Sequence, residues 1–298
     1  MTPQVKTLFQ TNVELLEIVD KAIVYFREQD YPKALEYMPE VSEKMRHVID
    51  GLLAENEYFE LVSTDSLMEM LEGIVEASRA EDYVLLADLL ELQLCTLLCN
   101  VQELIMKKED YAFFSEAMYR EQCEAMCKKL AAGGTELPEA LFETPLNPEE
   151  LLEQGYRVEV TSCGLMTVAV ATDRGSVYLH SNNKVGLEAF LVARGFARQD
   201  AETYLVKGFG MGYHVAELAK QKPEAKIEVY ESDGQVLKLA CAFSPLKKLL
   251  ENEKISVCYD EDGAAWHNRV ENLKDTETVC LHMPSVQAGS SLFSLRKK

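Results

Sequence analysis

Basic residues are scarce in this sequence, and glycine is almost absent from its first 131 positions. Lys and Arg total 30 against 50 Asp and Glu, which gives a formal charge of −20. Such a charge repels phosphate backbones and anionic lipid surfaces, so we expect neither nucleic-acid binding nor membrane binding. The sequence also lacks a Gly-x-Ser-x-Gly elbow, a Gly-Lys-Ser/Thr phosphate loop and a His-Glu-x-x-His motif. These absences argue against hydrolases, P-loop proteins and zinc proteases.

Long uncharged hydrophobic runs are missing as well. Acidic residues interrupt the first apolar stretch, so no secretory signal is visible. The most apolar stretch, 84–101, holds four polar or charged residues, which argue against a membrane span: Asp88, Glu91, Gln93 and Asn100. The eight cysteines do not form a short secreted framework, which favours reduced thiols. We therefore expect a soluble, cytoplasmic protein.

The first 131 residues have apolar side chains three and four positions apart, which is the helical period. This pattern predicts helices at 5–28, 31–55, 64–80, 82–106 and 111–130. We expect an α-helical bundle over residues 1–135, whose acidic surface is solvated and whose apolar faces are the candidate docking surface for a protein partner. Tandem helical repeats are the alternative, although no period of about 34 residues recurs.

Turn-forming residues then concentrate between 131 and 148, where we place the domain boundary: Gly133, Gly134, Pro138, Pro145 and Pro148. Beyond it, alternating patterns predict antiparallel strands within a β appendage at 156–181. From 203 to 283, strand and helix patterns alternate, which implies a parallel sheet covered by helices. The predicted fold class is α+β in two domains, with the helical bundle at 1–135 and a Rossmann-like α/β domain at 150–298.

A glycine-rich turn follows the predicted strand 203–207. Gly208, Gly210 and Gly212 would let a polar or anionic ligand approach backbone N–H groups at the start of a helix. Glu231 lies 19 residues beyond Gly212 at the end of the next strand, where a carboxylate can accept ribose hydroxyls. Asp260, after the third strand, is a candidate to line the base. Alternatively, the glycines serve tight packing and the acids are solvated strand ends.

Three histidines lie close to this edge in the predicted topology. His214, in the first turn of the following helix, is a candidate ligand contact, and His180-Ser181 and His282 end two strands as a candidate pocket edge. They either converge or stand as isolated edge residues. His47 and His267 show no partner in the sequence.

Cysteine pairs one helical turn apart raise a separate question about metal. Four thiols from two successive helices could form a zinc site: Cys95, Cys99, Cys123 and Cys127. The spacing is not that of zinc knuckles, and it is the spacing that boundary cysteines of ordinary helices show. We assign no metal site from the sequence.

The spacing of the glycine turn resembles that of S-adenosylmethionine-dependent methyltransferases of the Rossmann type. Those enzymes carry an acidic residue two positions before the first glycine, where this sequence has Val206. Few residues follow the fourth strand, so the sheet would also be smaller. A methyltransferase is therefore the alternative function.

A longer resemblance covers about 110 residues from Tyr178 onward. It rests on Leu179-His180-Ser181, Glu188-Ala189, Gly208-Phe209-Gly210-Met211-Gly212-Tyr213-His214 and Glu228-Val229-Tyr230-Glu231. These segments resemble the N-terminal region of the motility-associated-factor glycosyltransferases, bacterial proteins related to a pterin pyrophosphokinase-like domain. Active members transfer a nonulosonic acid from its CMP-activated form to flagellin, with the catalytic domain beyond the glycine turn.

This resemblance implies an accessory module that binds a nucleotide or nucleotide-sugar, or that serves as a scaffold, without catalysis by this chain alone. CMP-like ligands and S-adenosylmethionine are the candidate cofactors. A helical adaptor with a vestigial Rossmann site is a further alternative, in which the bundle at 1–135 docks the partner.

Overall fold

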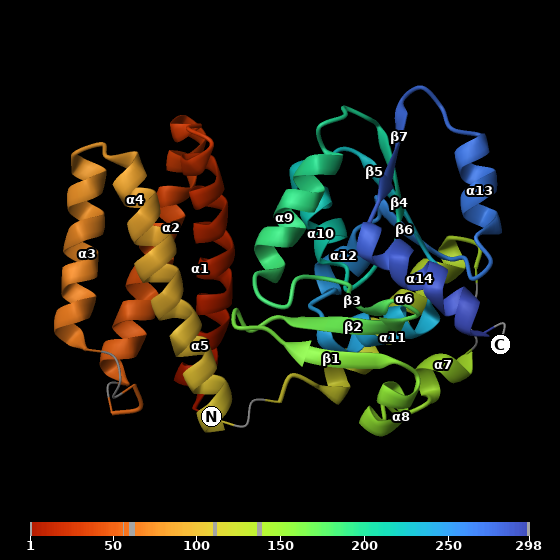
Figure 1. Ribbon diagram of the computed structural model, residues 1–298, viewed down its shortest axis with the longest axis horizontal. Coiled ribbons are helices and arrows are strands. Elements are labelled where there is room, and N and C mark those ends of the chain that lie inside the picture. The colour runs from red at the N-terminus through yellow and green to blue at the C-terminus, as the bar shows by residue number, and fades with distance from the viewer. Residues whose placement is uncertain (1, 56, 60–62, 110–111, 136–138, 297–298) are drawn as a thin grey trace. The chain divides into compact units, whose positions relative to one another are not determined.

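The computed structural model describes residues 2–55, 57–59, 63–109, 112–135 and 139–296. The chain folds into two compact units. Unit 1 comprises Met1–Tyr111 with Ser162–Leu165, and unit 2 comprises Ala112–Thr161 with Met166–Lys298. Pro138, which contributed to the predicted boundary, lies outside the described residues. The fold is mixed α+β, with helices at the N-terminus, a three-stranded antiparallel sheet and a four-stranded parallel sheet (Figure 1).

Unit 1 is helical, as the apolar periodicity predicts. Its elements are α1 (Pro3–Arg27), α2 (Tyr31–Ala54), α3 (Thr64–Arg79), α4 (Tyr83–Leu89), the π-helical turn η1 (Leu90–Leu94) and α5 (Cys95–Glu109). Side chains of Thr2, Asp30, Ser63 and Asp82 cap the N-termini of α1 to α4 by accepting backbone hydrogen bonds. α1 packs against both α2 and the α4–α5 helix, and α3 packs against α4.

Two turns of the same design join the helices of unit 1 in pairs. Gln29 and Glu81 each adopt a left-handed backbone, with φ of 62° and 54°. An Asp follows each of them and caps the next helix, and a Tyr then begins that helix. The rings of Tyr31 and Tyr83 lie 4.7 Å apart, so the two turns are neighbours. Unit 1 therefore consists of two successive helical hairpins with equivalent turns.

The continuous helix Tyr83–Glu109 is long and apolar enough to cross a membrane by length and composition. This is weak evidence, since a core helix of a soluble protein has the same properties. The helical period at 82–106 predicts one apolar stripe on this helix. Leu97 of this stripe is half-buried in the structure, and the other members are buried: Leu86, Leu90, Leu94, Leu98, Val101 and Ile105.

Unit 2 begins with α6 (Glu116–Ala132), α7 (Glu139–Glu143) and α8 (Pro148–Glu153). The predicted β appendage follows as β1 (Tyr156–Val160), β2 (Met166–Thr172) and β3 (Gly175–Tyr178). These strands pair antiparallel in the order β1-β2-β3, with Tyr156 opposite Val170. Thr172 pairs with Gly175 across the turn that joins β2 to β3.

The parallel sheet carries the predicted alternation of strands and helices. Its strands are β4 (Thr203–Lys207), β5 (Lys226–Glu231), β6 (Ile255–Tyr259) and β7 (Glu277–Leu281), in the order β6-β5-β4-β7. The connecting helices are α9 (Val185–Phe196), α10 (Tyr213–Gln221), α11 (Gly234–Phe243), α12 (Lys247–Glu251) and α13 (Ala264–Glu271), and α14 (Met283–Arg296) follows β7. The sequence patterns did not predict α12 and α14. The inner strand β4 is almost wholly buried, as in parallel sheets with both faces covered, whereas the other inner strand, β5, alternates buried with half-buried residues after the exposed Lys226.

Helix α6 belongs to unit 2, although the periodicity alone assigned it to the helical bundle. Its apolar side chains join the core of the parallel sheet: Tyr119, Cys123, Met126 and Leu130. The buried Gln122 amide donates to the carbonyls of Cys241 and Ser244, and its oxygen accepts from the Leu246 N–H at 2.6 Å. The division between the units therefore lies near residue 111, before α6, rather than within the glycine and proline cluster at 131–148.

Candidate functional site

The carboxyl ends of β4, β5 and β7 meet at the predicted glycine turn. Gly208, Gly210 and Gly212 all have positive φ, at 98°, 51° and 81°. A Cβ atom at Gly212 would lie 2.7 Å from the Leu246 side chain. At Gly208 a Cβ would collide with Ser285 of α14. These two glycines therefore serve conformation and close packing, which was the alternative interpretation of the motif.

The Glu231 carboxylate lies against the backbone N–H groups of the glycine turn, where the sequence analysis expected an external ligand. One carboxylate oxygen accepts from the N–H groups of Phe209 at 2.7 Å and Gly210 at 3.3 Å. The other accepts from Ser232 at 2.9 Å and Asp233 at 3.0 Å. The side chain is 3% exposed, and its burial, together with the charge of Asp233, raises its pKa to about 7. The carboxylate of Glu231 thus binds the chain's own glycine turn.

Asp260 has a comparable internal role. It is buried, and its two oxygens accept from the N–H groups of Ala265 at 3.0 Å and Trp266 at 2.9 Å. These bonds satisfy backbone donors in the first turn of α13. Glu231 and Asp260 are therefore buried at strand ends and bonded to backbone, and not solvated there as the alternative interpretation expected.

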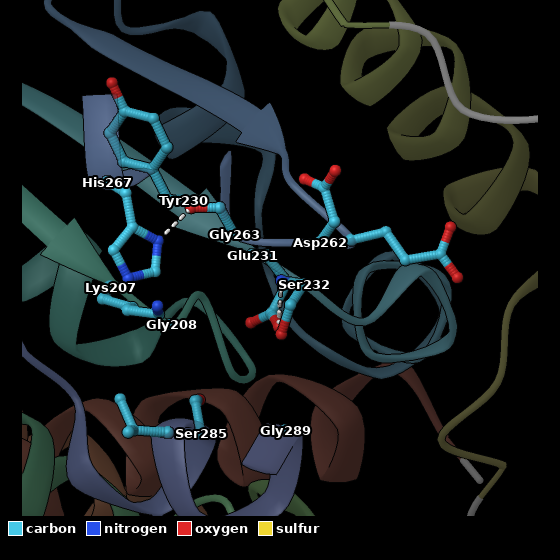
Figure 2. A pocket seen from close by; sticks show the side chains of 12 residues that line it. Lys207, Gly208, Tyr230, Glu231, Ser232, Asp262, Gly263, His267, Ser285 and Gly289 are labelled. Carbon is cyan, nitrogen blue, oxygen red and sulfur yellow. Dashed lines mark hydrogen bonds between the residues drawn. The ribbon is translucent and has the colours of Figure 1, made fainter. Parts of the chain in front are cut away.

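A cleft opens beside the glycine turn, at the carboxyl ends of β4, β5 and β6 (Figure 2). Of the sequence-predicted site residues, Gly208 and Glu231 line it. The sequence analysis did not name the other lining residues as site residues: Lys207, Tyr230, Ser232, Glu261, Asp262, Gly263, His267, Ser285, Val286 and Gly289. The available signal was their position, because Lys207, Ser232 and Glu261–Gly263 end or directly follow strands at the edge where open α/β sheets bind ligands.

The cleft presents both charges and hydroxyl groups. The Lys207 ammonium lies 5.3 Å from the centre of the Trp266 ring. The exposed His267 donates from Nδ1 to the Gly263 carbonyl at 2.6 Å, which leaves Nε2 as an acceptor if the ring is neutral. Ser285 and Gly289 of α14 lie across the cleft from Lys207 and His267 (Figure 2).

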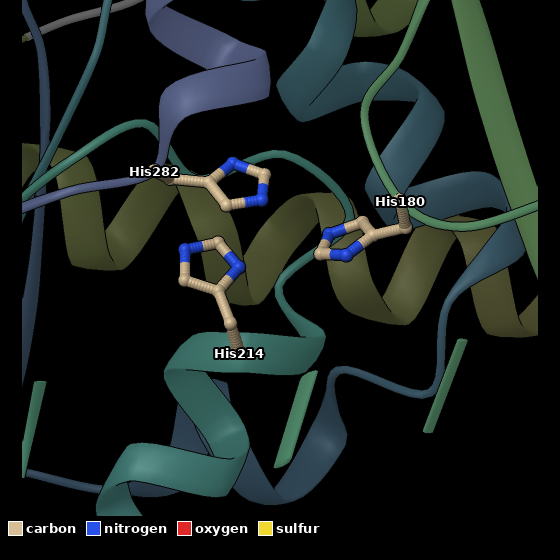
Figure 3. Close-up of side chains that lie close together, drawn as sticks. All are labelled: His180, His214 and His282. Atoms are coloured by element: carbon tan, nitrogen blue, oxygen red, sulfur yellow. The ribbon is translucent and has the colours of Figure 1, made fainter. Parts of the chain in front are cut away.

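The three predicted edge histidines converge behind the glycine turn (Figure 3). His214 and His282 stack with ring centres 4.0 Å apart and an angle of 11° between the planes. His180 lies 4.9 Å from His282 and 5.4 Å from His214. All three side chains are buried. The interpretation of these residues as isolated edge histidines is wrong, because β3, β7 and α10 bring them into one cluster.

Hydrogen-bonding contacts at the ring nitrogens hold each ring in place. His214 Nε2 lies 3.1 Å from the Gly208 carbonyl, and His282 Nδ1 lies 2.7 Å from Ser285 Oγ. His180 Nε2 accepts from the Met211 N–H at 3.2 Å. Burial lowers the pKa of His214 and of His282 well below the ordinary value of 6.5, and in each case neighbouring histidines add to the effect. Both rings are therefore neutral at pH 7.

Glu188 and Ser181 complete the surroundings of the cluster. Glu188 Oε2 lies 3.2 Å from His180 Nδ1 and accepts from the Ser181 N–H at 2.8 Å. Burial opposes ionisation of Glu188, but the bonds from His180 and Ser181 outweigh it and lower the pKa of this carboxyl. The Ser181 hydroxyl accepts from the N–H groups of Asn183 and Lys184, so it shapes the loop before α9.

The cysteine pairs considered as zinc ligands belong to different units. Cys95 and Cys99 lie in unit 1, whereas Cys123 and Cys127 lie on α6 in unit 2. Within the described part of the chain, the group able to hold a metal ion is His180, His214 and His282.

Comparison with known families gives a match within unit 1. A family model for a domain of unknown function, DUF8042, matches residues 5–104. No curated protein matches the chain. The match covers about a third of the sequence and leaves the parallel sheet outside it.

Proposed function

We propose that unit 2 is an accessory, Rossmann-like binding module for a nucleotide or nucleotide-sugar, and that the ligand occupies the cleft at the carboxyl ends of β4, β5 and β6. The observation that carries this proposal is the position of the cleft. It lies at the edge where open α/β sheets bind ligands, and it combines a cation with hydroxyl and carboxylate groups.

The cleft offers a partner for each part of such a ligand. The Lys207 ammonium is placed for a phosphate, and Ser232 and Ser285 supply hydroxyl groups beside it. Asp262 supplies a carboxylate at the rim that can accept sugar hydroxyls, the role that the sequence assigned to Glu231. Glu231 instead holds the glycine turn in shape from behind.

The resemblance to motility-associated-factor glycosyltransferases supports CMP or a CMP-sugar as the first ligands to test. An S-adenosylmethionine-dependent methyltransferase is less well supported. Val206, at the position of the usual acidic residue, is fully buried within β4, so it offers no group to the amino-acid end of that cofactor.

A thermal-shift panel of CMP, CDP, UDP, NAD and S-adenosylmethionine tests the proposal on the full chain. A ligand at 100 times its Kd stabilises by about 2.7 kcal/mol, which raises Tm by about 5 °C or more. We expect a shift with a nucleotide and a Kd at least about tenfold weaker in Lys207→Met, since a charged hydrogen bond contributes about 1.5–3 kcal/mol.

Lys226→Met is the matched control, because it removes the same charge from an exposed residue at the opposite end of β5. It should leave the Kd unchanged. The proposal fails if no nucleotide shifts Tm, or if Lys207→Met binds as tightly as the wild type. A shift with S-adenosylmethionine alone would favour the methyltransferase alternative.

A further inference from the structure

We propose that His180, His214 and His282 form a binding site for a divalent transition-metal ion of the zinc class, with Glu188 as the adjoining carboxylate. Their potential ligand atoms lie within 4.8 Å of one another, and Figure 3 shows the three rings gathered around a common centre. The inference does not rest on nucleotide binding, because the histidines do not line the cleft.

The first argument is that two ring nitrogens lack partners in a buried place. Among the described residues, His214 Nδ1 and His282 Nε2 have no hydrogen-bond partner. A carbonyl only accepts, so the bond to Gly208 places the proton of His214 on Nε2 and leaves a lone pair on Nδ1. Buried polar atoms are nearly always satisfied, so an unpaired lone pair at a histidine cluster points to a missing partner.

The second argument is that the outer contacts match those of metal-bound histidines. Such ligands usually donate the second ring N–H to a carbonyl, a carboxylate or another acceptor, which fixes the ring and its tautomer. His214 does this with the Gly208 carbonyl, and His282 contacts Ser285 Oγ at 2.7 Å. Both free nitrogens are therefore presented by rings that are already oriented.

Charge and space also suit an ion. The Glu188 carboxylate, whose Oε1 lies 4.0 Å from His282 Nε2, would offset part of the charge of a cation. Gly210 keeps the centre open, since a Cβ there would lie 3.0 Å from His180 Nε2 and 3.2 Å from the His282 ring. Imidazole ligands favour zinc, copper, iron and nickel over magnesium and calcium.

Binding would draw the ligands together. Zn–N bonds of about 2.0–2.1 Å in a tetrahedral site place ligand nitrogens about 3.4 Å apart. The present separations, which reach 4.8 Å, must therefore shorten by up to about 1.4 Å. His180 would also exchange the bond that its Nε2 accepts from the Met211 N–H for the ion, because its Nδ1 faces Glu188.

The test uses full-length protein stripped with chelator and then titrated with Zn²⁺ and, as a spectroscopic probe, Co²⁺. We expect one equivalent of bound metal per chain and the intense visible absorption of tetrahedral Co²⁺ with nitrogen and oxygen ligands. His214→Gln and His282→Gln should each weaken binding at least about 100-fold. Ser285→Ala, which removes an outer contact, should weaken it about 10- to 100-fold.

Two controls separate the histidine site from folding defects and from the thiols. His47→Gln removes an exposed histidine in unit 1 and should leave binding unchanged. ¹¹³Cd NMR distinguishes nitrogen and oxygen ligands from thiolates, and circular dichroism of the metal-free variants reports their folding. The proposal is overturned if the wild type binds no metal, if the cadmium resonance shows thiolate ligands, or if folded His214→Gln and His282→Gln bind like the wild type. Lys207→Met should bind metal normally, so failure of nucleotide binding and failure of metal binding are distinguishable.

Discussion

Replacing Glu231 by Ala should destabilise unit 2 by at least about 3 kcal/mol. The carboxylate accepts four backbone N–H groups, and three of those bonds, from Phe209, Gly210 and Asp233, are buried. A buried donor left without its partner costs about 1–3 kcal/mol. Three such donors would sum to about 3–9 kcal/mol, and water entering the space of the lost side chain moves the expected value toward the lower limit.

Glu231→Gln refines the same prediction, because it keeps the shape and one acceptor oxygen. Its amide group would face two N–H donors, so we expect a loss of about 2–4 kcal/mol. The variant also removes a titration. The folded pKa of about 7 lies above the ordinary 4.5, so the folded wild type holds a proton that the unfolded chain releases between these values. Stability from this group is complete below pH 4.5 and falls as pH rises toward 7, by roughly 3 kcal/mol.

Urea unfolding at several pH values from 4.5 to 8 measures both effects, followed by the fluorescence of Trp266 in unit 2. The difference between wild type and Glu231→Gln isolates the contribution of this carboxyl group. Glu224→Ala is the matched control, because its carboxylate is 93% exposed and should contribute little. If Glu231→Ala loses less than about 1 kcal/mol and only weakens nucleotide binding, the carboxylate serves a ligand and our reasoning about its internal role is wrong.

Gln122→Ala should lower the free energy of unfolding, measured in urea, by about 2–4 kcal/mol, because it leaves two buried carbonyls and one N–H of unit 2 without hydrogen-bond partners. A decrease below about 1 kcal/mol would contradict this. A fragment of residues 112–298 should unfold cooperatively in a thermal melt, whereas a fragment of residues 136–298 should aggregate because it lacks α6. A well-folded 136–298 fragment would refute the assignment of α6 to this core. In metal-free protein, the lowered pKa values of His214 and His282 make stability, complete above pH 6.5, fall as pH decreases below it. His282→Gln should flatten this acid slope, and an unchanged slope would show that His282 takes up a proton in the fold.

Local sequence patterns predicted the individual helices and strands of this fold well, but they predicted less well which elements pack against one another. The apolar stripe of 82–106 and the alternation at 203–283 each report one element at a time, and the structure has both. α6 illustrates the limit, because an amphipathic helix has the same period whether it packs on other helices or on a sheet. The buried Gln122, which ties α6 to the 241–246 segment, gives no sign of this role in the sequence.

The sequence patterns placed Gly208 and Glu231 at strand ends beside the cleft, but they did not reveal the contacts of the Glu231 carboxylate. The end of β3, the end of β7 and the first turn of α10 bring His180, His282 and His214 together, and the sequence could indicate their nearness but not their convergence. Glu231 lies where its spacing predicts, yet its carboxylate turns inward to backbone N–H groups. Whether an acid at a strand end faces a ligand or its own chain depends on burial by distant segments such as α14, which local spacing does not encode.

The paired turns at Gln29 and Glu81 have a consequence for how unit 1 gains and loses structure. α1 lies between its hairpin partner α2 and the second hairpin, while α3 contacts α4 at the other side, so the hairpins follow one another in a line. In such arrays the free energy is approximately the sum of a term for each repeat and one for each junction. α1 buries thirteen of its residues and α3 buries four. The array should therefore fray from α3 inward, and backbone amides of α3 should exchange with solvent well before those of α1.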